Sequence, residues 1–302
     1  MKRMIVMAAA LGLVLTTFSP SSAHAPSTKN FAAVQVPIGV NGVMNLSLDG
    51  DLSEWDNVPS VFWVTHDDLT EVITGTQGDP DAGNLAERLI VGWSPDTNLL
   101  YVMEERFDDL WYGQEEGTND KLELVIDADH SGGQFQGVES IDLDPARWAG
   151  AEAQDWQQSL HQEANLWLWG GGEWAAVEPW SGIRWNVDGE SGGPATLSQE
   201  SWFTPFDDLP ASSTGPDDPD LVIHDLTEGE AIGFGFVVQD DDNGPGDGYN
   251  GFWVSTGDVN IYFHADALVD YALLGFDAGN WVYDATAVEA DSWARIKAGF
   301  SK

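Results

Sequence analysis

Tryptophans crowd the middle of the chain, where five of the fifteen fall between residues 166 and 185: Trp167, Trp169, Trp174, Trp180 and Trp185. Flat aromatic rings bind the C–H faces of sugars, while polar neighbours hydrogen-bond the hydroxyl groups. Such neighbours are present at Glu173, Glu178, Arg184 and Asn186. Trp167 and Trp169 are two residues apart and would share one face of a strand. The segment predicts a carbohydrate-binding platform, and the alternative is core packing, which we expect for Trp55 and Trp93.

A first acidic loop offers oxygen ligands at alternate positions ahead of a glycine: Asp127, Asp129 and Ser131. This spacing is similar to the first half of a calcium loop, in which several oxygens converge on one ion. The twelfth position is Val138 rather than a bidentate acid, so the loop is not an EF-hand. Calcium binding is one interpretation of this loop, and a solvated turn is the other.

A second acidic loop follows an apolar segment and contains three candidate ligands: Asp240, Asp242 and Asp247. Like charges this close repel one another, and a bound cation would relieve the repulsion. Because the chain carries 51 acidic residues, clusters of this kind also arise by chance on a solvated surface. Calcium is therefore predicted here with the same alternative as in the first loop.

Composition excludes several classes of function. The 302 residues include 51 acidic and 11 basic side chains, a formal net charge of −40, and no cysteine. Such a surface repels nucleic-acid phosphates and anionic lipids, and the lack of cysteine excludes disulfides, zinc–thiolate sites and thiol nucleophiles. The sequence has no Gly-x-Ser-x-Gly, P-loop or dinucleotide motif. We therefore predict a ligand-binding protein that is not an enzyme.

Residues 1–25 have the features of an export signal. Lys2 and Arg3 precede the apolar run Ile5–Leu15, and Ala23-His24-Ala25 fits a small-x-small cleavage site. No later apolar stretch approaches the roughly 18 residues that a membrane-spanning helix needs. The sequence thus predicts a periplasmic or secreted protein with no transmembrane segment in its mature chain, and it leaves the oligomeric state open.

Short apolar segments bounded by Gly, Asp, Asn and Pro predict an all-β protein. Leu89–Trp93 and Leu99–Met103, separated by five turn residues, indicate a hairpin. Residues 121–126 alternate between apolar and polar positions, and the continuous apolar run of Ala231–Val238 predicts a strand buried on both faces. Further short strands are expected at residues 252–254, 259–263 and 281–283. The predicted fold is an antiparallel β-sandwich of the immunoglobulin-like or jelly-roll-like kind.

One or two short helices are expected beside the strands. Ala146–Glu163 has a composition compatible with a helix, and Asp291 or Ser292 can cap a final helix that ends at Lys297. Residues 26–42 are expected to be a flexible lead-in. Residues 43–302 are expected to form one domain, since neither a Pro/Ser-rich linker nor a fixed-period repeat divides them.

Four segments follow one another in a recognisable order. They are LDGDLSEW at residues 48–55, the hairpin from Gly92-Trp93 to Asp108-Asp109, DKLELVID at 120–127, and the strand at 226–242 that ends in acidic residues. Together they resemble the family 9 carbohydrate-binding-module-like fold, which is related to the DOMON superfamily. The resemblance implies a β-sandwich, and its carbohydrate-binding members hold a sugar between two aromatic side chains. The tryptophan-rich segment lies outside this pattern.

The resemblance also implies an alternative ligand. Some relatives of this fold bind b-type haem through a methionine and a histidine or lysine, and the pair to test here is Met103 with His264. A haem-binding electron-transfer domain is therefore one alternative, and a surface protein whose sandwich mediates assembly is another. The leading prediction is an exported, non-catalytic domain that binds a glycan through exposed tryptophans and carries structural calcium.

Overall fold

The computed structural model describes residues 31–37, 46–72, 83–135, 153–162, 165–169, 172–246 and 251–281. Within these ranges regular structure consists of β-strands and short 3-10 helices, without an α-helix. The all-β prediction is confirmed. The predicted export signal, the predicted final helix and Asp247 lie outside the described residues. None of the described helices has the length and apolar character needed to cross a bilayer.

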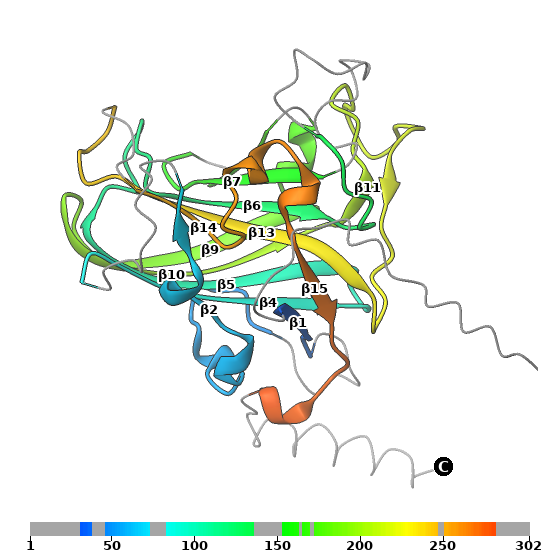
Figure 1. Ribbon diagram of the computed structural model, residues 1–302, viewed down its shortest axis with the longest axis horizontal. Coiled ribbons are helices and arrows are strands. Elements are labelled where there is room, and N and C mark those ends of the chain that lie inside the picture. Colours follow the sequence, from blue (N-terminus) through cyan, green and yellow to red (C-terminus); the bar gives the residue numbers. More distant parts are fainter. Residues whose placement is uncertain are drawn as a thin grey trace, which may run out of the picture.

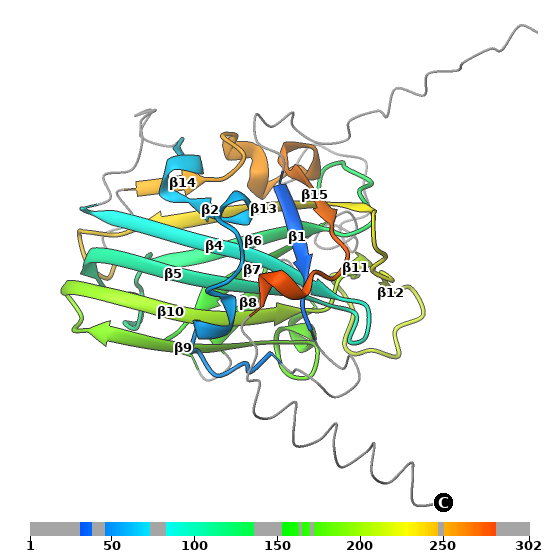
Figure 2. The same ribbon diagram turned by 90° about the horizontal axis from the view of Figure 1, so that it is seen from below.

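Most strands form two layers that pack face to face (Figures 1 and 2). The first sheet contains, in spatial order, β8 (Asn165–Leu168), β7 (Gln154–Ser159), β6 (Lys121–Asp127), β13 (Ala231–Asp240) and β15 (Val269–Leu273). The second contains β4 (Leu85–Ser94), β5 (Leu99–Trp111), β10 (Gly193–Phe203) and β9 (Ser181–Gly189), which Figure 2 shows face on. Shorter strands extend these sheets or form a separate hairpin: β14 (Gly251–Val254), β3 (Thr70–Glu71), β2 (Val64–Thr65), β11 (Phe206–Asp208) and β12 (Val222–Ile223).

Strand β1 (Phe31–Gln35) joins the two sheets along one side. It pairs in parallel with β15 through Phe31–Ala33 and with β4 through Val34 and Gln35. The prediction of a flexible lead-in is wrong for these five residues, because they form a strand in which Phe31, Ala33 and Val34 are buried. The fold is also not purely antiparallel, since both pairings of β1 are parallel. One side of the sandwich is thereby closed, which gives the sheet arrangement the character of a near-barrel.

The opposite side of the sandwich is a seam. Strands β8 and β9 are the two ends of the path of paired strands and do not pair with each other. The 3-10 helix η5 (Glu173–Ala176) follows β8 and packs against both β8 and β9. Backbone edges, a short helix and loop residues therefore meet at this seam, whereas regular strand pairing covers the other side.

Alternate residues of each strand fill the core between the sheets. Leu122, Leu124 and Ile126 of β6 face inward as predicted, together with Phe234 and Phe236 of β13. The outer faces are covered as well, by two smaller apolar clusters around Trp55 and around residues 259–268. This double coverage explains the continuous apolar sequence of β13, whose predicted burial on both faces is confirmed. The core positions predicted for Trp55 and Trp93 are also confirmed.

Two local predictions are wrong. Gln154–Ser159 is the buried strand β7 rather than part of a helix, because its polar side chains find hydrogen-bond partners on β6 and β5. Residues 259–262 form the 3-10 helix η6 (Val259–Tyr262) instead of a strand, since the Asp258 side chain accepts the N–H of Asn260 at 2.9 Å and caps the turn. Of the strand predicted at 281–283, only Trp281 is described; it is buried and follows the 3-10 helix η8 (Ala278–Asn280). The other described 3-10 helices are η1 (Ser53–Trp55), η2 (Ser60–Phe62), η3 (His66–Asp68) and η7 (Ala265–Ala267).

Candidate functional site

Two hollows lie side by side at the seam, on either side of the exposed Val177. The first has a volume of about 290 Å³ and lies between β8 and η5. The second has a volume of about 430 Å³ and lies against the first residues of β9. Volumes of this size suit small ligands or single residues of a polymer. The hollows draw their lining from 162–184, the part of the chain that the tryptophan spacing indicated.

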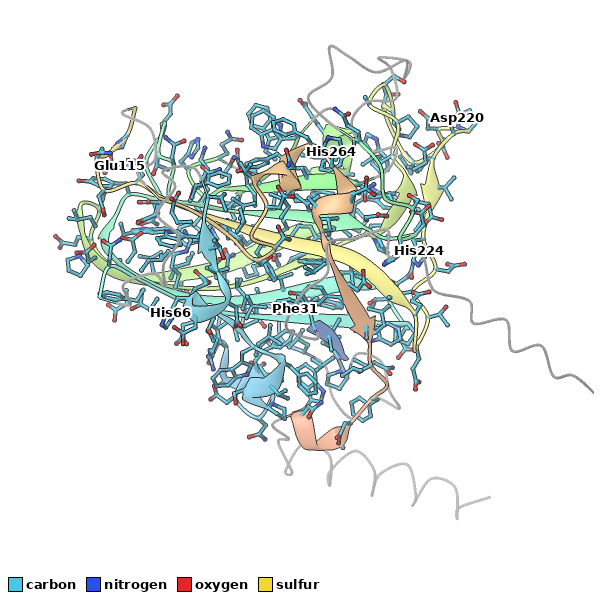
Figure 3. All side chains as sticks on the ribbon, viewed as in Figure 1. Phe31, His66, Glu115, Asp220, His224 and His264 are labelled. Atoms are coloured by element: carbon cyan, nitrogen blue, oxygen red, sulfur yellow. The ribbon has the colours of Figure 1, made fainter. Side chains whose placement is uncertain are left out.

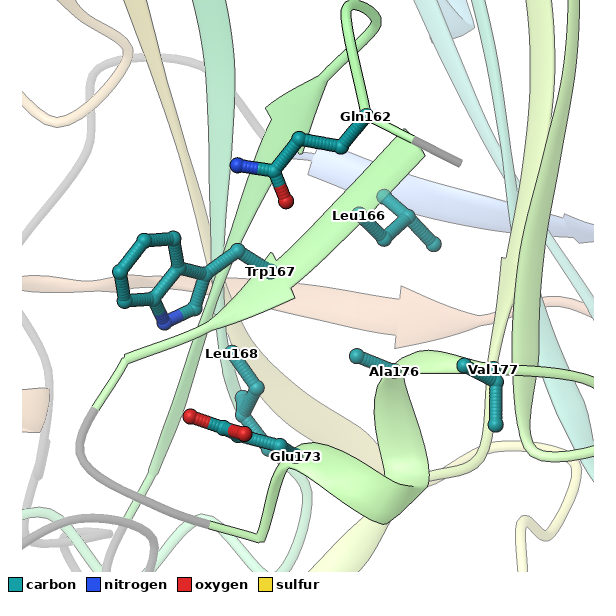
Figure 4. A pocket seen from close by; sticks show the side chains of 7 residues that line it. All are labelled: Gln162, Leu166, Trp167, Leu168, Glu173, Ala176 and Val177. Carbon is teal, nitrogen blue, oxygen red and sulfur yellow. The ribbon is translucent and has the colours of Figure 1, made fainter. Parts of the chain in front are cut away.

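The first hollow combines an apolar floor with a polar rim. Leu166, Leu168, Ala176 and Val177 supply the apolar lining. Figure 4 shows the Gln162 amide, the Trp167 indole and the Glu173 carboxylate directed to the same side of the hollow. Gln162 was not among the predicted site residues, since an isolated glutamine carries no sequence signal. An aromatic face flanked by an amide and a carboxylate can hold a sugar ring and hydrogen-bond its hydroxyl groups.

Trp167 and Trp169 form an exposed pair. Both project from the outer face of the first sheet, with Trp167 opposite Gln157 of β7, and each keeps 41% of its surface accessible. Their rings are stacked, with centroids 5.5 Å apart and planes 18° from parallel. The two indoles therefore lie on the same side of the sheet, although Trp169 follows the last residue of β8 and is not part of the strand. Trp167 also lines the first hollow, so the exposed aromatic surface runs directly into it.

The separation of these two rings defines how a ligand can contact them. A sugar held between two aromatic planes needs a carbon–carbon contact of about 3.5–4.0 Å on each face, or about 7–8 Å between the planes. The centroids of Trp167 and Trp169 are only 5.5 Å apart. No sugar ring fits between them in this arrangement. Their outer faces and edges are the surfaces that remain available to a ligand.

The second hollow contains Glu178 and Arg184, two of the three charged residues predicted for the site. The Arg184 guanidinium donates to Glu178 Oε1 at 2.6 Å, and its central carbon lies 5.1 Å from the centre of the Trp202 ring. Both members of the ion pair are about half exposed, so its contribution to stability is small. The pair instead holds Arg184 in one orientation over the hollow. Asn165 and Ser181 complete the polar lining and were not predicted.

The other three tryptophans of the segment are half-buried and pack against the core. Trp174 lies in η5 and not in a strand, because Gly172 turns the chain with a left-handed φ of 70° immediately before it. Its ring meets Trp180 edge-on at 5.1 Å, and its Nε1 donates to Ser213. Trp185 faces inward from β9. The five rings therefore do not form one platform: Trp167 and Trp169 are open to solvent, and the other three support the scaffold.

The first acidic loop closes on itself. The Asp127 carboxylate accepts the backbone N–H of Ser131 at 3.2 Å and that of Gly132 at 2.8 Å. Asp129 also accepts from Ser131, at 3.1 Å. These bonds define a tight polar turn in which Asp127 is buried and Asp129 is exposed. Calcium binding by this loop stays a prediction.

The second acidic loop takes part in a larger group of carboxylates. Asp240, at the end of β13, lies inside the sandwich with Asp108 of β5 and Asp120, which precedes β6. Asp242 lies in a second, half-buried group with Asp108 and Asp109. Asp240 and Asp242 therefore belong to two overlapping groups that share Asp108, and calcium binding by the predicted loop stays a prediction. Asp108, Asp109 and Asp120 were not predicted.

The two proposed haem ligands lie on opposite sides of the molecule. Met103 packs in the apolar cluster around Trp55, on the outer face of the second sheet. His264 pairs through its backbone with Gln134, beside the cluster that covers the outer face of the first sheet. The whole sandwich therefore separates the two side chains, so they cannot ligate one iron. The haem alternative built on this pair is wrong.

No protein-family model and no curated protein matches this chain. Similar solved structures include two of a family 9 carbohydrate-binding module from Caldicellulosiruptor kristjanssonii, one in complex with glucose and one in complex with cellotriose. The first is 12% identical, has a TM-score of 0.47, and covers 83% of this chain and 97% of its own. The second is 12% identical, with a TM-score of 0.48 and coverages of 83% and 95%. Both structures are of the family that the sequence motifs of this chain resemble.

Proposed function

We propose that this chain is a non-catalytic carbohydrate-binding module whose ligand stacks on Trp167 at the seam of the sandwich. The observation that carries the proposal is the pair of exposed, mutually stacked tryptophans beside a polar-rimmed hollow. Exposed tryptophans in register on a strand edge form a flat apolar surface, and such surfaces mark ligand sites on soluble proteins. Half-buried Trp174, Trp180 and Trp185 stiffen the segment behind them.

The charges around the site favour a neutral glycan. Glu173 stands at the first hollow, and Glu178 neutralises Arg184 at the second. The chain as a whole carries a formal charge of −40. The negative electrostatic field of the chain would repel uronate or sulfate groups. Hydroxyl groups, in contrast, can accept hydrogen bonds from amides and donate them to carboxylates. The proposed ligand class is therefore an uncharged saccharide.

Export is part of the same proposal. The basic start, the apolar run and the Ala23-His24-Ala25 site support passage across a membrane, after which the domain meets extracellular or periplasmic glycans. A surface rich in carboxylates and poor in lysine suits a saline or calcium-rich exterior.

Replacement of Trp167 by alanine is expected to weaken glycan binding at least tenfold, because stacking on the indole is lost while the fold is kept. The measurement is a glycan-array screen of the wild-type chain, followed by calorimetric titration of the best neutral saccharide. Trp169→Ala is expected to weaken binding less. Trp169 lies outside the hollow and affects the ligand only indirectly, by stacking on the Trp167 ring.

Phe276→Ala is the matched control. Phe276 is an aromatic side chain with similar exposure, 39%, but it lies after β15, away from the seam. Its removal is expected to leave the affinity unchanged. Equal affinities in the wild type, Trp167→Ala and Trp169→Ala would contradict the proposal, and so would the absence of any saccharide ligand on the array.

A further inference from the structure

Three aspartates converge inside one end of the sandwich, and this feature does not depend on the carbohydrate proposal. Asp108 comes from β5 of the second sheet, whereas Asp120 and Asp240 come from the first sheet, before β6 and at the end of β13. One carboxylate oxygen of each lies within 4.8 Å of the others. The three side chains are only 1–2% exposed. In Figure 3 this end of the sandwich is the one at which Glu115 is labelled.

The charge of the buried cation Arg106 is shared between these three acids and two glutamates. Arg106 donates its hydrogen bonds to Glu87 and Glu104 and none to the aspartates. Among the described residues, no lysine, arginine or histidine forms an ion pair with Asp108, Asp120 or Asp240. Three buried acids without an ion-pair partner are thus held where ionised carboxylates are disfavoured.

Two carboxylate oxygens of this group are buried without a hydrogen-bond partner. Asp108 Oδ1 accepts the N–H of Leu110 at 2.9 Å, and Asp240 Oδ2 accepts the amide of Asn84 at 2.9 Å. The second oxygens of these residues, Asp108 Oδ2 and Asp240 Oδ1, are fully buried and have no hydrogen-bond partner. Buried polar atoms almost always have a partner. Each carboxylate is therefore fixed by one oxygen and free to coordinate through the other.

Asp120 is fixed even more firmly. Its Oδ2 accepts the N–H of Tyr112 at 2.5 Å, and its Oδ1 accepts the N–H of Asp241 at 2.6 Å. Both donors lie in segments that flank the other two acids, so these bonds bring the ends of β5 and β13 together. Carboxyl oxygens retain a second lone pair that can face a cation. The arrangement has the oriented outer contacts expected of a metal site.

We infer that Asp108, Asp120 and Asp240 bind one hard divalent cation of the calcium type, which ties the two sheets together at this end of the sandwich. Three carboxylates supply oxygen ligands alone, which suits calcium and not softer metals. Calcium accepts six to eight oxygens in flexible geometry, which fits carboxylates that arrive from three strand ends. Asp109 and Asp242 form a half-buried group with Asp108 on the solvent side, along which an ion can enter.

Calcium-dependent thermal unfolding of the full chain tests this inference. After removal of metals with EDTA, 1 mM CaCl₂ is expected to raise the melting temperature of the wild type by roughly 5–10 °C, as for a ligand at about 100 times its Kd. Asp240→Asn is expected to abolish the shift. Its amide can keep the bond to Asn84 and donate to the remaining acids, so in EDTA this variant is expected to melt at or above the wild-type temperature.

Asp96→Asn is the matched control, because Asp96 is an exposed aspartate in the turn between β4 and β5, at the far end of β5 from Asp108. It is expected to retain the full calcium shift, and Asp108→Asn is expected to lose it. A shift that survives in both Asp240→Asn and Asp108→Asn, or that disappears only in Asp96→Asn, would overturn the assignment. No calcium shift in the wild type, or a larger response to MgCl₂ than to CaCl₂, would overturn it too. Glycan binding is not a readout here, so failure of one proposal does not affect the other.

Discussion

Replacing Arg106 by methionine is expected to lower the free energy of unfolding by about 3–5 kcal/mol. Arg106 is completely buried on β5, where its Nε donates to Glu87 at 3.2 Å and its Nη2 donates to Glu104 at 2.6 Å. Methionine fills much of the same volume but leaves two buried carboxylates without their cation. Most of the expected decrease in the free energy of unfolding comes from the two carboxylates left without a cation, and not from lost packing.

Urea unfolding followed by tryptophan fluorescence measures this difference. Arg88 is the matched control, because it lies on the adjacent strand and pairs with the half-exposed Glu105 at 3.0 Å. Arg88→Met is expected to change stability by less than about 1 kcal/mol. The triple variant Glu87→Gln/Glu104→Gln/Arg106→Met is expected to recover most of the lost stability, since no buried charge remains unpaired. Equal effects of Arg106→Met and Arg88→Met would contradict the argument.

The strands were predictable where side chains follow a simple burial pattern. The alternation in β6 and the apolar run of β13 identified both strands. In β5 the inward row begins with Leu100 and Val102 and continues with charged residues, so the apolar pattern ends after residue 103 although the strand continues to Trp111. Glu104 and Arg106 stay inside because side chains on β4, β7 and β10 bond to them, and a single sequence does not reveal those partners.

Strand β7 also could not be predicted from its local sequence. Its sequence, QDWQQS, has the composition of a helix, and local propensity alone predicts one. In the folded chain Gln157 donates to Glu123 of β6, and Gln158 donates to Glu104 of β5 at 2.9 Å. Tertiary hydrogen bonds between residues 34 and 54 positions apart thus override the local preference. Such partners become visible only once strand order and register are known.

The candidate site was predictable only where its residues are close together in the sequence. Spacing of two placed Trp167 and Trp169 on one strand face, because a strand repeats every two residues. Trp174, Trp180 and Trp185 follow a left-handed turn at Gly172, and no fixed period relates them to β8. The acidic triad draws on Asp108, Asp120 and Asp240, which belong to separate segments and meet only when the two sheets pack. Its members could not be found from clusters of acids in the sequence.

The LDGDLSEW segment illustrates how a recognisable motif depends on one distant residue. Glu200, on the outer face of β10, accepts the backbone N–H groups of Asp49 and Gly50 through Oε2, each at 3.0 Å. Its Oε1 accepts the indole N–H of Trp55 at 2.9 Å. Gly50 has a left-handed φ of 83°, and a Cβ there would lie 2.7 Å from the Asn186 amide. The motif is thus a tight turn wrapped around a single buried carboxyl group.

Replacing Glu200 by glutamine is expected to reduce stability by an amount that depends on pH. Burial, aided by the charge of Glu54, raises the pKa of Glu200 to about 7, from an ordinary value of 4.5. The folded chain therefore holds this proton more tightly than the unfolded chain. The resulting stabilisation is fully present below pH 4.5 and is lost as the pH rises through 7. Glutamine does not titrate and keeps only one acceptor oxygen for the three donors.

Urea unfolding of wild type and Glu200→Gln at pH 5 and pH 8 isolates this group, because both proteins share every other titrating residue. The wild type is expected to exceed the variant in free energy of unfolding at pH 5, and the gap is expected to shrink by about 2–3 kcal/mol at pH 8. A gap that stays constant between the two pH values would show that Glu200 is ionised throughout. The turn would then be held by an anion that accepts three N–H bonds, and the variant's loss of stability would reflect the backbone or indole N–H groups left without an acceptor.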